Sequence, residues 1–200
     1  NTALGKQTLF NNTSGTGNTA IGNIALIANT TGSNNTAIGQ LSMWSNTSGG
    51  KNVAIGFQPL KLNTTGMNNI AIGENSLLNS VSASAHSAIG WNSLLNTTGA
   101  SSTALGSWAG QTNTTGNNNL YLGDEADALA GNYSNSAATG SHAKVGASNS
   151  IVRGGTGAWA ANVGIGTTSP YAKLSVVGEI VGAFFTGTTT ATSTFGGNLA

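Results

Sequence analysis

Residues 18–22 read NTAIG, residues 35–39 read NTAIG again, and residues 52–56 read NVAIG. The glycine that ends each copy recurs along the chain at Gly5, Gly22, Gly39, Gly56, Gly73, Gly90, Gly106, Gly123 and Gly140. The interval is 17 residues throughout, except for 16 between Gly90 and Gly106, where we place the missing residue near Leu95. A fixed period of this length is the signature of a repeat architecture.

The composition is unusual for a globular domain, because 6% of the 200 residues are charged, against roughly 25% in typical domains. Hydrophobic residues make up 38% and the formal net charge is +1, so the chain can bury apolar surface and lacks the composition of a disordered segment. The charge indicates no nucleic-acid partner and no binding to anionic lipid. The absence of cysteine excludes disulfides and thiolate metal sites. No apolar run approaches the roughly 20 residues of a membrane span.

One repeat, NTAIGNIALIANTTGSN at residues 18–34, is too short to enclose a core of its own. TAIG suits a short strand that ends at a glycine corner, IALI suits a second strand, and NTTGSN is typical of a turn. Copies of such a unit must stack, so the sequence predicts an all-β fold, a parallel β-solenoid (β-roll) of about eight 17-residue coils over residues 1–146. A shorter coil ends it.

Residues 147–200 have a different composition, and we expect an irregular β-rich segment that connects to, or begins, the next fibre module. The apolar run from Leu174 to Phe185 resembles a buried strand pair more than an amphipathic helix. We expect it to pack against another subunit, since so short a tail has little core of its own. The whole chain is interpreted as a piece of a longer protein.

Two columns of strand residues alternate in the repeat, and their directions decide the core. We predict that the first is an inward core ladder, formed by Ile21, Ile38, Ile55, Ile72, Ile89 and Leu105. The neighbouring alanines then face outward by the period-two rule. We predict that they form a subunit interface: Ala20, Ala37, Ala54, Ala71 and Ala88. The alternative is a tight interior that admits only alanine. A further ladder is expected on the second strand, at Leu9, Leu26, Met43, Leu60, Leu77 and Leu94.

Asparagine forms a column of its own, at Asn12, Asn29, Asn46, Asn63, Asn96 and Asn113. Stacked amides can hydrogen-bond from coil to coil at a spacing of roughly 4.8 Å. The same residues begin Asn-x-Ser/Thr sequences, so glycosylation is one interpretation. A purely structural turn is the interpretation we favour.

Three tryptophans are candidates for stacking on a carbohydrate ligand: Trp44, Trp91 and Trp108, with Phe10 and Phe57 as lesser ones. The alternative is that they lie at coil edges or at a subunit interface, and they do not share one column. Asp124, Glu125 and Asp127 lie close together but lack the alternating spacing of a calcium loop, so we expect a solvated turn.

No residues combine into a catalytic pattern. Glu74 and Glu179 stand alone among amides, whereas glycoside hydrolysis needs paired carboxylates. His86 occupies a column otherwise filled by asparagine, and His142 has no visible serine or aspartate partner. The sequence therefore predicts no enzyme, no catalytic or cofactor-binding residues, no cofactor and no tightly bound metal.

The NTAIG and NVAIG coils with a downstream glycine resemble the head repeats of trimeric autotransporter adhesins, over residues 1–146. NVGIGTTSPYAKLSVVG, at residues 162–178, resembles a segment of phage tail fibres and of bacterial surface proteins. The resemblance implies a homotrimer of β-rolls, joined end to end in a fibre, at a cell surface or on a virion.

The expected function is therefore a structural segment of an extracellular fibre or filament with an adhesive role. The alternative is a receptor- or carbohydrate-binding adhesin head or phage tail fibre, whose partner is a host-surface glycan or protein. A remote alternative is an ice-binding solenoid, motivated by the paired threonines of the turns at Thr30–Thr31, Thr64–Thr65, Thr97–Thr98 and Thr114–Thr115. These pairs lie at turns and lack the T-x-T spacing of a flat array.

Overall fold

The computed structural model describes residues 1–155, 158, 160–165, 167–170 and 172–176. The chain forms two compact units, Asn1–Ala161 and Asn162–Ala200. Most of the apolar run between Leu174 and Phe185 lies outside the described residues, as does Glu179.

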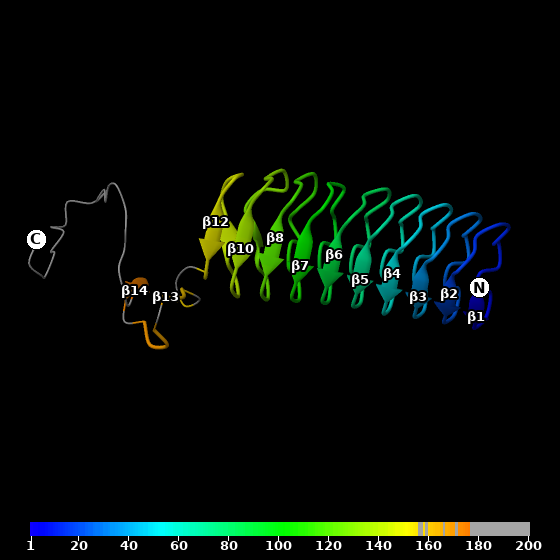
Figure 1. Ribbon diagram of the computed structural model, residues 1–200, viewed down its shortest axis with the longest axis horizontal. Coiled ribbons are helices and arrows are strands. Elements are labelled where there is room, and N and C mark those ends of the chain that lie inside the picture. Colours follow the sequence, from blue (N-terminus) through cyan, green and yellow to red (C-terminus); the bar gives the residue numbers. More distant parts are fainter. Residues whose placement is uncertain (156–157, 159, 166, 171, 177–200) are drawn as a thin grey trace, which may run out of the picture. The chain divides into compact units, whose positions relative to one another are not determined.

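The first unit is a parallel β-solenoid, as predicted (Figure 1). Each coil contributes one short strand to a ten-stranded parallel sheet, in which paired residues such as Ala20 and Ala37 are one repeat apart. The strands are β1 (Thr2–Leu4), β2 (Thr19–Ile21), β3 (Thr36–Ile38), β4 (Val53–Ile55), β5 (Ile70–Ile72), β6 (Ser87–Ile89), β7 (Thr103–Leu105), β8 (Leu120–Leu122), β10 (Ala137–Thr139) and β12 (Ile151–Arg153).

The last coil is shorter, as predicted, because Ala137 of β10 pairs with Ile151 of β12, 14 residues further on. Strand β12 lies beyond residue 146, the end predicted for the repeat domain. The solenoid therefore continues to at least Arg153.

The second wall of the coil is not the strand that the sequence predicted. Among the described residues of the first unit, only β9 (Asp127–Ala128) and β11 (Lys144–Val145) form strands there, paired with each other. In an earlier coil the backbone visits left-handed φ values at alternate residues, 62° at Ile24 and 50° at Leu26. Ile24 N–H donates to Lys6 O of the preceding coil, and Leu26 N–H donates to Ser42 O of the following one. This alternation keeps the coils bonded without a regular strand.

The predicted directions of the two strand columns were wrong. The alanines predicted to form a subunit interface, Ala20, Ala37, Ala54, Ala71 and Ala88, are fully buried inside their own chain. The predicted core ladder faces outward: Ile21, Ile38, Ile55 and Ile72 are half-buried, and Ile89 and Leu105 are 39% and 47% exposed. The alternative of a tight interior is confirmed.

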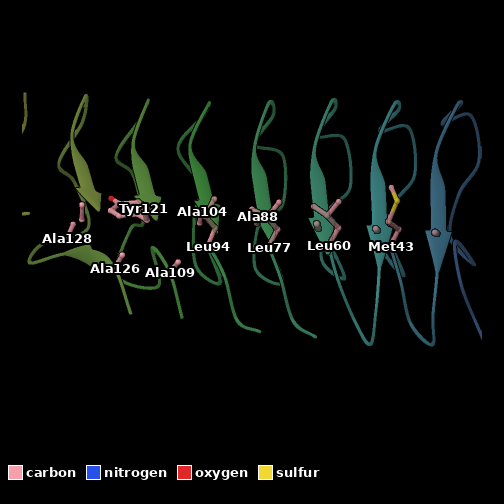
Figure 2. Close-up of a cluster of buried hydrophobic side chains, with 14 of the residues drawn as sticks. Met43, Leu60, Leu77, Ala88, Leu94, Ala104, Ala109, Tyr121, Ala126 and Ala128 are labelled. Carbon is pink, nitrogen blue, oxygen red and sulfur yellow. The ribbon is translucent and has the colours of Figure 1, made fainter. Parts of the chain in front are cut away.

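The reason for this reversal is the narrowness of the coil. The residues that face the alanines from the second wall are Leu26, Met43, Leu60, Leu77 and Leu94, all fully buried, as Figure 2 shows for four of them. A leucine or methionine fills the space between the walls, so a methyl group is all that the strand side can add. The corner glycine is under the same constraint: a Cβ on Gly22, at φ 127°, would lie 2.7 Å from Gly39 O of the next coil.

Two buried amide ladders run along the solenoid. In the predicted ladder, Asn29 Nδ2 donates to Asn12 Oδ1 (2.8 Å), Asn46 to Asn29 (2.8 Å) and Asn63 to Asn46 (2.9 Å). The first residue of NTAIG builds another ladder, since the Asn18 amide oxygen accepts the Asn35 N–H (2.9 Å) and Asn35 accepts the Asn52 N–H (3.0 Å).

The missing residue of the sixth repeat was misplaced by the sequence analysis. Thr97, not Asn96, stands in the asparagine ladder, because it is fully buried and its hydroxyl accepts a hydrogen bond from Asn113 Nδ2 (3.2 Å). Leu94 also keeps its place in the leucine column. The deletion therefore lies in the turn between Thr97 and Gly99, where an irregular loop is accommodated most easily.

In the second unit, β13 (Val163–Ile165) pairs in parallel with β14 (Leu174–Val176). The turn between them is closed by a hydrogen bond from Asn162 Nδ2 to Pro170 O (3.0 Å).

Candidate functional site

The outer face of the ten-stranded sheet carries an unbroken apolar column. Its members are Leu4, Ile21, Ile38, Ile55, Ile72, Ile89, Leu105 and Leu122. The neighbouring outward column holds Thr19, Thr36, Val53, Ile70, Ser87, Thr103 and Leu120, with no charged residue. We call the two columns together the strand face. A contiguous apolar face of this kind is unusual on the surface of a monomer.

The predicted stacking aromatics fall into separate groups. Trp44 is 41% exposed and lines an apolar hollow of about 350 Å³ with Asn11, Ile27, Ala28 and Ser45. Trp91 and Trp108 lie one repeat apart and touch, with ring centroids 4.8 Å apart in an edge-to-face arrangement at 71°. Phe10 and Phe57 are exposed and line neither hollow.

Trp108 lines a second hollow, of about 260 Å³, that the sequence analysis did not predict. Its walls are Trp108, Gln111, Glu125, Asp127 and Lys144; we call it the Trp108 pocket. The pocket is polar, and it combines one aromatic side chain with two carboxylates, one ammonium and one amide.

Asp127 departs most from expectation, since it is buried and not in a solvated turn. It occupies the column that holds Leu60, Leu77 and Leu94 in earlier coils, and its exposed fraction is 3%. Its carboxylate accepts the N–H groups of Thr112 (3.0 Å) and Ala128 (2.8 Å), and Lys144 Nζ lies 3.8 Å away. Burial raises the pKa of Asp127, and these hydrogen bonds and Lys144 partly offset the increase.

Asp124 and Glu125 are exposed, as expected for a solvated turn. Glu125 Oε2 lies 3.4 Å from His142 Nε2, and Ser141 Oγ lies 2.7 Å from His142 Nδ1. Asp124, Glu125 and His142 offer ligand atoms within 4.8 Å of one another. These three residues could contribute to a cation site, whereas the sequence had grouped Asp127 with the two acids.

His86 replaces an asparagine of the second ladder and reproduces its hydrogen bonds. Ser102 N–H donates to Nδ1 (3.1 Å), which fixes the proton on Nε2, and Nε2 then donates to Gly99 O (2.8 Å). Burial lowers the pKa of His86, and the bonds to Gly99 and Ser102 oppose the shift. This residue has a structural role, as its column predicted.

The turn residues are also used within the fold. Asn29, Asn46, Asn63 and Asn113 are fully buried, so their amides are not accessible for glycosylation in the folded chain. Thr30 Oγ1 donates to Thr47 O (3.0 Å), and Thr47 and Thr64 repeat this bond to the following coil. Because these hydroxyls are engaged by the fold, the arrangement disfavours a threonine array that binds ice.

The contacts at the Trp108 pocket have a simple signal in the sequence. Trp91 and Trp108, Glu125 and His142, and Asp127 and Lys144 are each 17 residues apart, one repeat along the chain. Residues at this spacing stack in a solenoid. Counting columns from the corner glycines concealed the tryptophan pair, because the 16-residue repeat lies between its members.

Among the described residues, no helix has the length and apolar composition needed to span a membrane. Comparison of the chain with protein-family models, with curated proteins and with solved structures finds no match.

Proposed function

We propose that this chain is a structural segment of an extracellular fibre, a surface appendage or a virion fibre, in which it works as a homotrimer. The strand face is the observation that carries the proposal. It presents half-exposed isoleucine and leucine on successive coils, in a chain with few charged residues on its surface.

A second copy of the chain is the partner that fits the strand face best. Neighbouring strands of a parallel sheet are spaced by about 4.8 Å, so the isoleucine side chains form a row with that repeat. A copy of the same solenoid has a row with an identical repeat and can match it coil by coil. Three copies that turn their strand faces to a common axis would bury the row completely, and burial is worth roughly 25 cal/mol per Å² of apolar surface.

The interior supports a fibre role for a different reason. The buried amide ladders and the parallel strand bonds repeat in every coil, so the stability of the solenoid grows with its length and needs no globular core. A fibre segment requires this property.

A carbohydrate-binding adhesin or tail fibre is the second candidate. The Trp108 pocket favours it, because an aromatic face and several polar side chains converge there.

Sedimentation measurements on the purified chain test the proposal. The wild type should sediment at three times the chain mass of 19.7 kDa. Ile55→Lys places a charge in the middle of the strand face and should yield folded monomers. The control Leu62→Lys changes a residue of similar exposure outside the sheet (37%) and should leave the trimer intact. A monomeric wild type would contradict the proposal.

A further inference from the structure

The coils that form the Trp108 pocket abandon the repeat pattern inside the solenoid. Tyr121 stands in the alanine column opposite Ala104, Gly110 stands in the leucine column after Leu94, and Asp127 follows Gly110 in the same column. Three of the five acidic residues of the whole sequence, Asp124, Glu125 and Asp127, lie in this coil.

The fold does not require these changes. Earlier coils place leucine or methionine at the position of Asp127, and they are bonded to their neighbours in the same way. A buried carboxylate is less favourable than a buried leucine unless its hydrogen bonds compensate fully. Such departures from a local rule are expected where a protein binds something.

We propose that the Trp108 pocket binds a saccharide, with one pyranose ring seated between Trp108 and the Asp127–Lys144 pair. This site goes beyond the fibre role proposed above and does not depend on it. The pocket volume of about 260 Å³ is just below the roughly 300–1,000 Å³ of pockets for drug-sized ligands, so one ring is the ligand that it suits.

The chemistry of the walls matches a sugar ring on both of its aspects. The indole of Trp108 offers an apolar face for the C–H side of a pyranose. The carboxylates of Glu125 and Asp127 accept hydrogen bonds from hydroxyl groups, while Lys144 Nζ and the Gln111 amide donate to hydroxyl or ring oxygens. Neutral ligands with several adjacent hydroxyls use all of these groups at once.

The pocket is also held in shape before a ligand arrives. Trp91 packs its ring edge-to-face with Trp108, and three residues anchor Asp127 through Thr112 N–H, Ala128 N–H and Lys144 Nζ. Fixed groups lose little conformational entropy on binding. A cationic ligand is a poorer match, because the ammonium group of Lys144 lines the same pocket and would repel it.

Saturation-transfer NMR on the full chain tests this inference, with glucose, galactose, mannose, N-acetylglucosamine, N-acetylgalactosamine and sialic acid as probes. At least one of them should receive magnetisation at its ring C–H protons. Trp108→Ala should weaken binding by about tenfold or more, and Trp108→Phe should weaken it less, because an aromatic face remains. Asp127→Asn, which keeps the side-chain shape, should also weaken it.

The matched control is Trp44→Ala. Trp44 is similarly exposed but lines a hollow without a carboxylate or an ammonium group, so its removal should leave the signal unchanged. Circular dichroism and thermal melting of each variant separate loss of binding from loss of folding. Absence of transfer to every probe would overturn the inference, as would equal losses in Trp44→Ala and Trp108→Ala in folded proteins.

Discussion

The ring of Tyr121 occupies the space that Gly110 leaves open in the leucine column. A Cβ on Gly110 would lie 2.6 Å from Tyr121 Cδ2 and 2.7 Å from Leu94 Cδ2. In the regular coils the strand wall supplies alanine and the second wall supplies leucine. Here the large residue comes from the strand wall and the small one from the second wall, so the interior stays filled (Figure 2).

The Tyr121–Gly110 exchange predicts strong coupling between the two positions. Tyr121→Ala alone leaves a cavity and should destabilise by about 3–5 kcal/mol. Gly110→Leu alone forces a second large side chain against the ring and should destabilise by about 1–3 kcal/mol. The double variant restores the regular alanine–leucine pair and should be more stable than either single variant. Urea denaturation measures all three, and simple additivity would refute the exchange.

The inward direction of the alanines predicts that added volume there is not tolerated. Ala54→Leu should destabilise the chain by about 1–3 kcal/mol or more, since Ala54 is fully buried against the leucine column. Val53→Leu, an outward change on the same strand, should stay within about 0.5 kcal/mol. Thermal melting of both variants checks the difference, and equal effects would mean that the two faces are not distinct.

The buried amide ladder predicts a large effect at a polar residue. Asn46 donates to Asn29 Oδ1 (2.8 Å) and Gly49 O (3.0 Å), and it accepts from Asn63 Nδ2 (2.9 Å). Asn46→Ala leaves buried partners unsatisfied and should destabilise by about 1–3 kcal/mol. Asn11→Ala, at an exposed position, serves as the control. Similar denaturation midpoints for the two variants would exclude a stabilising ladder.

Much of the architecture could be predicted from the sequence, because the 17-residue period leaves room for nothing larger than one small coil. The directions of the strand columns could not. Period two dictates that Ala54 and Ile55 point to opposite sides, but which side is interior depends on how close the second wall lies. That distance is a property of the assembled coil, and hydrophobicity alone favoured isoleucine inside.

The Trp108 pocket was missed for a related reason. Asp127 was interpreted as a surface acid because charged residues are rarely buried without partners. Its partner, Lys144, is one repeat away in the sequence and adjacent in space. Comparison of residues one period apart, made position by position and not from the corner glycines, would have identified this pair.

His86 predicts a pH dependence of stability. Burial lowers its folded pKa below the ordinary value of 6.5, so the unfolded chain takes up a proton that the folded chain resists. Stability from the neutral ring is therefore complete above about pH 6.5 and should be lost as the pH falls below it. His86→Asn restores the column residue and should remove this component. Denaturation midpoints between pH 7.5 and pH 5, on the order of one unit either side of the ordinary value, measure it. Parallel curves for the two proteins would contradict this role.

Cross-linking through single cysteines tests the central claim, that the alanines face the private interior and the isoleucines face a second copy. The natural chain has no cysteine, so each variant carries one thiol. Under mild oxidation, Ile55→Cys should form linked chains, visible at twice the chain mass on a non-reducing gel. Ala54→Cys should remain a single chain with an unreacted thiol. Linked chains from Ala54→Cys, with none from Ile55→Cys, would contradict the account.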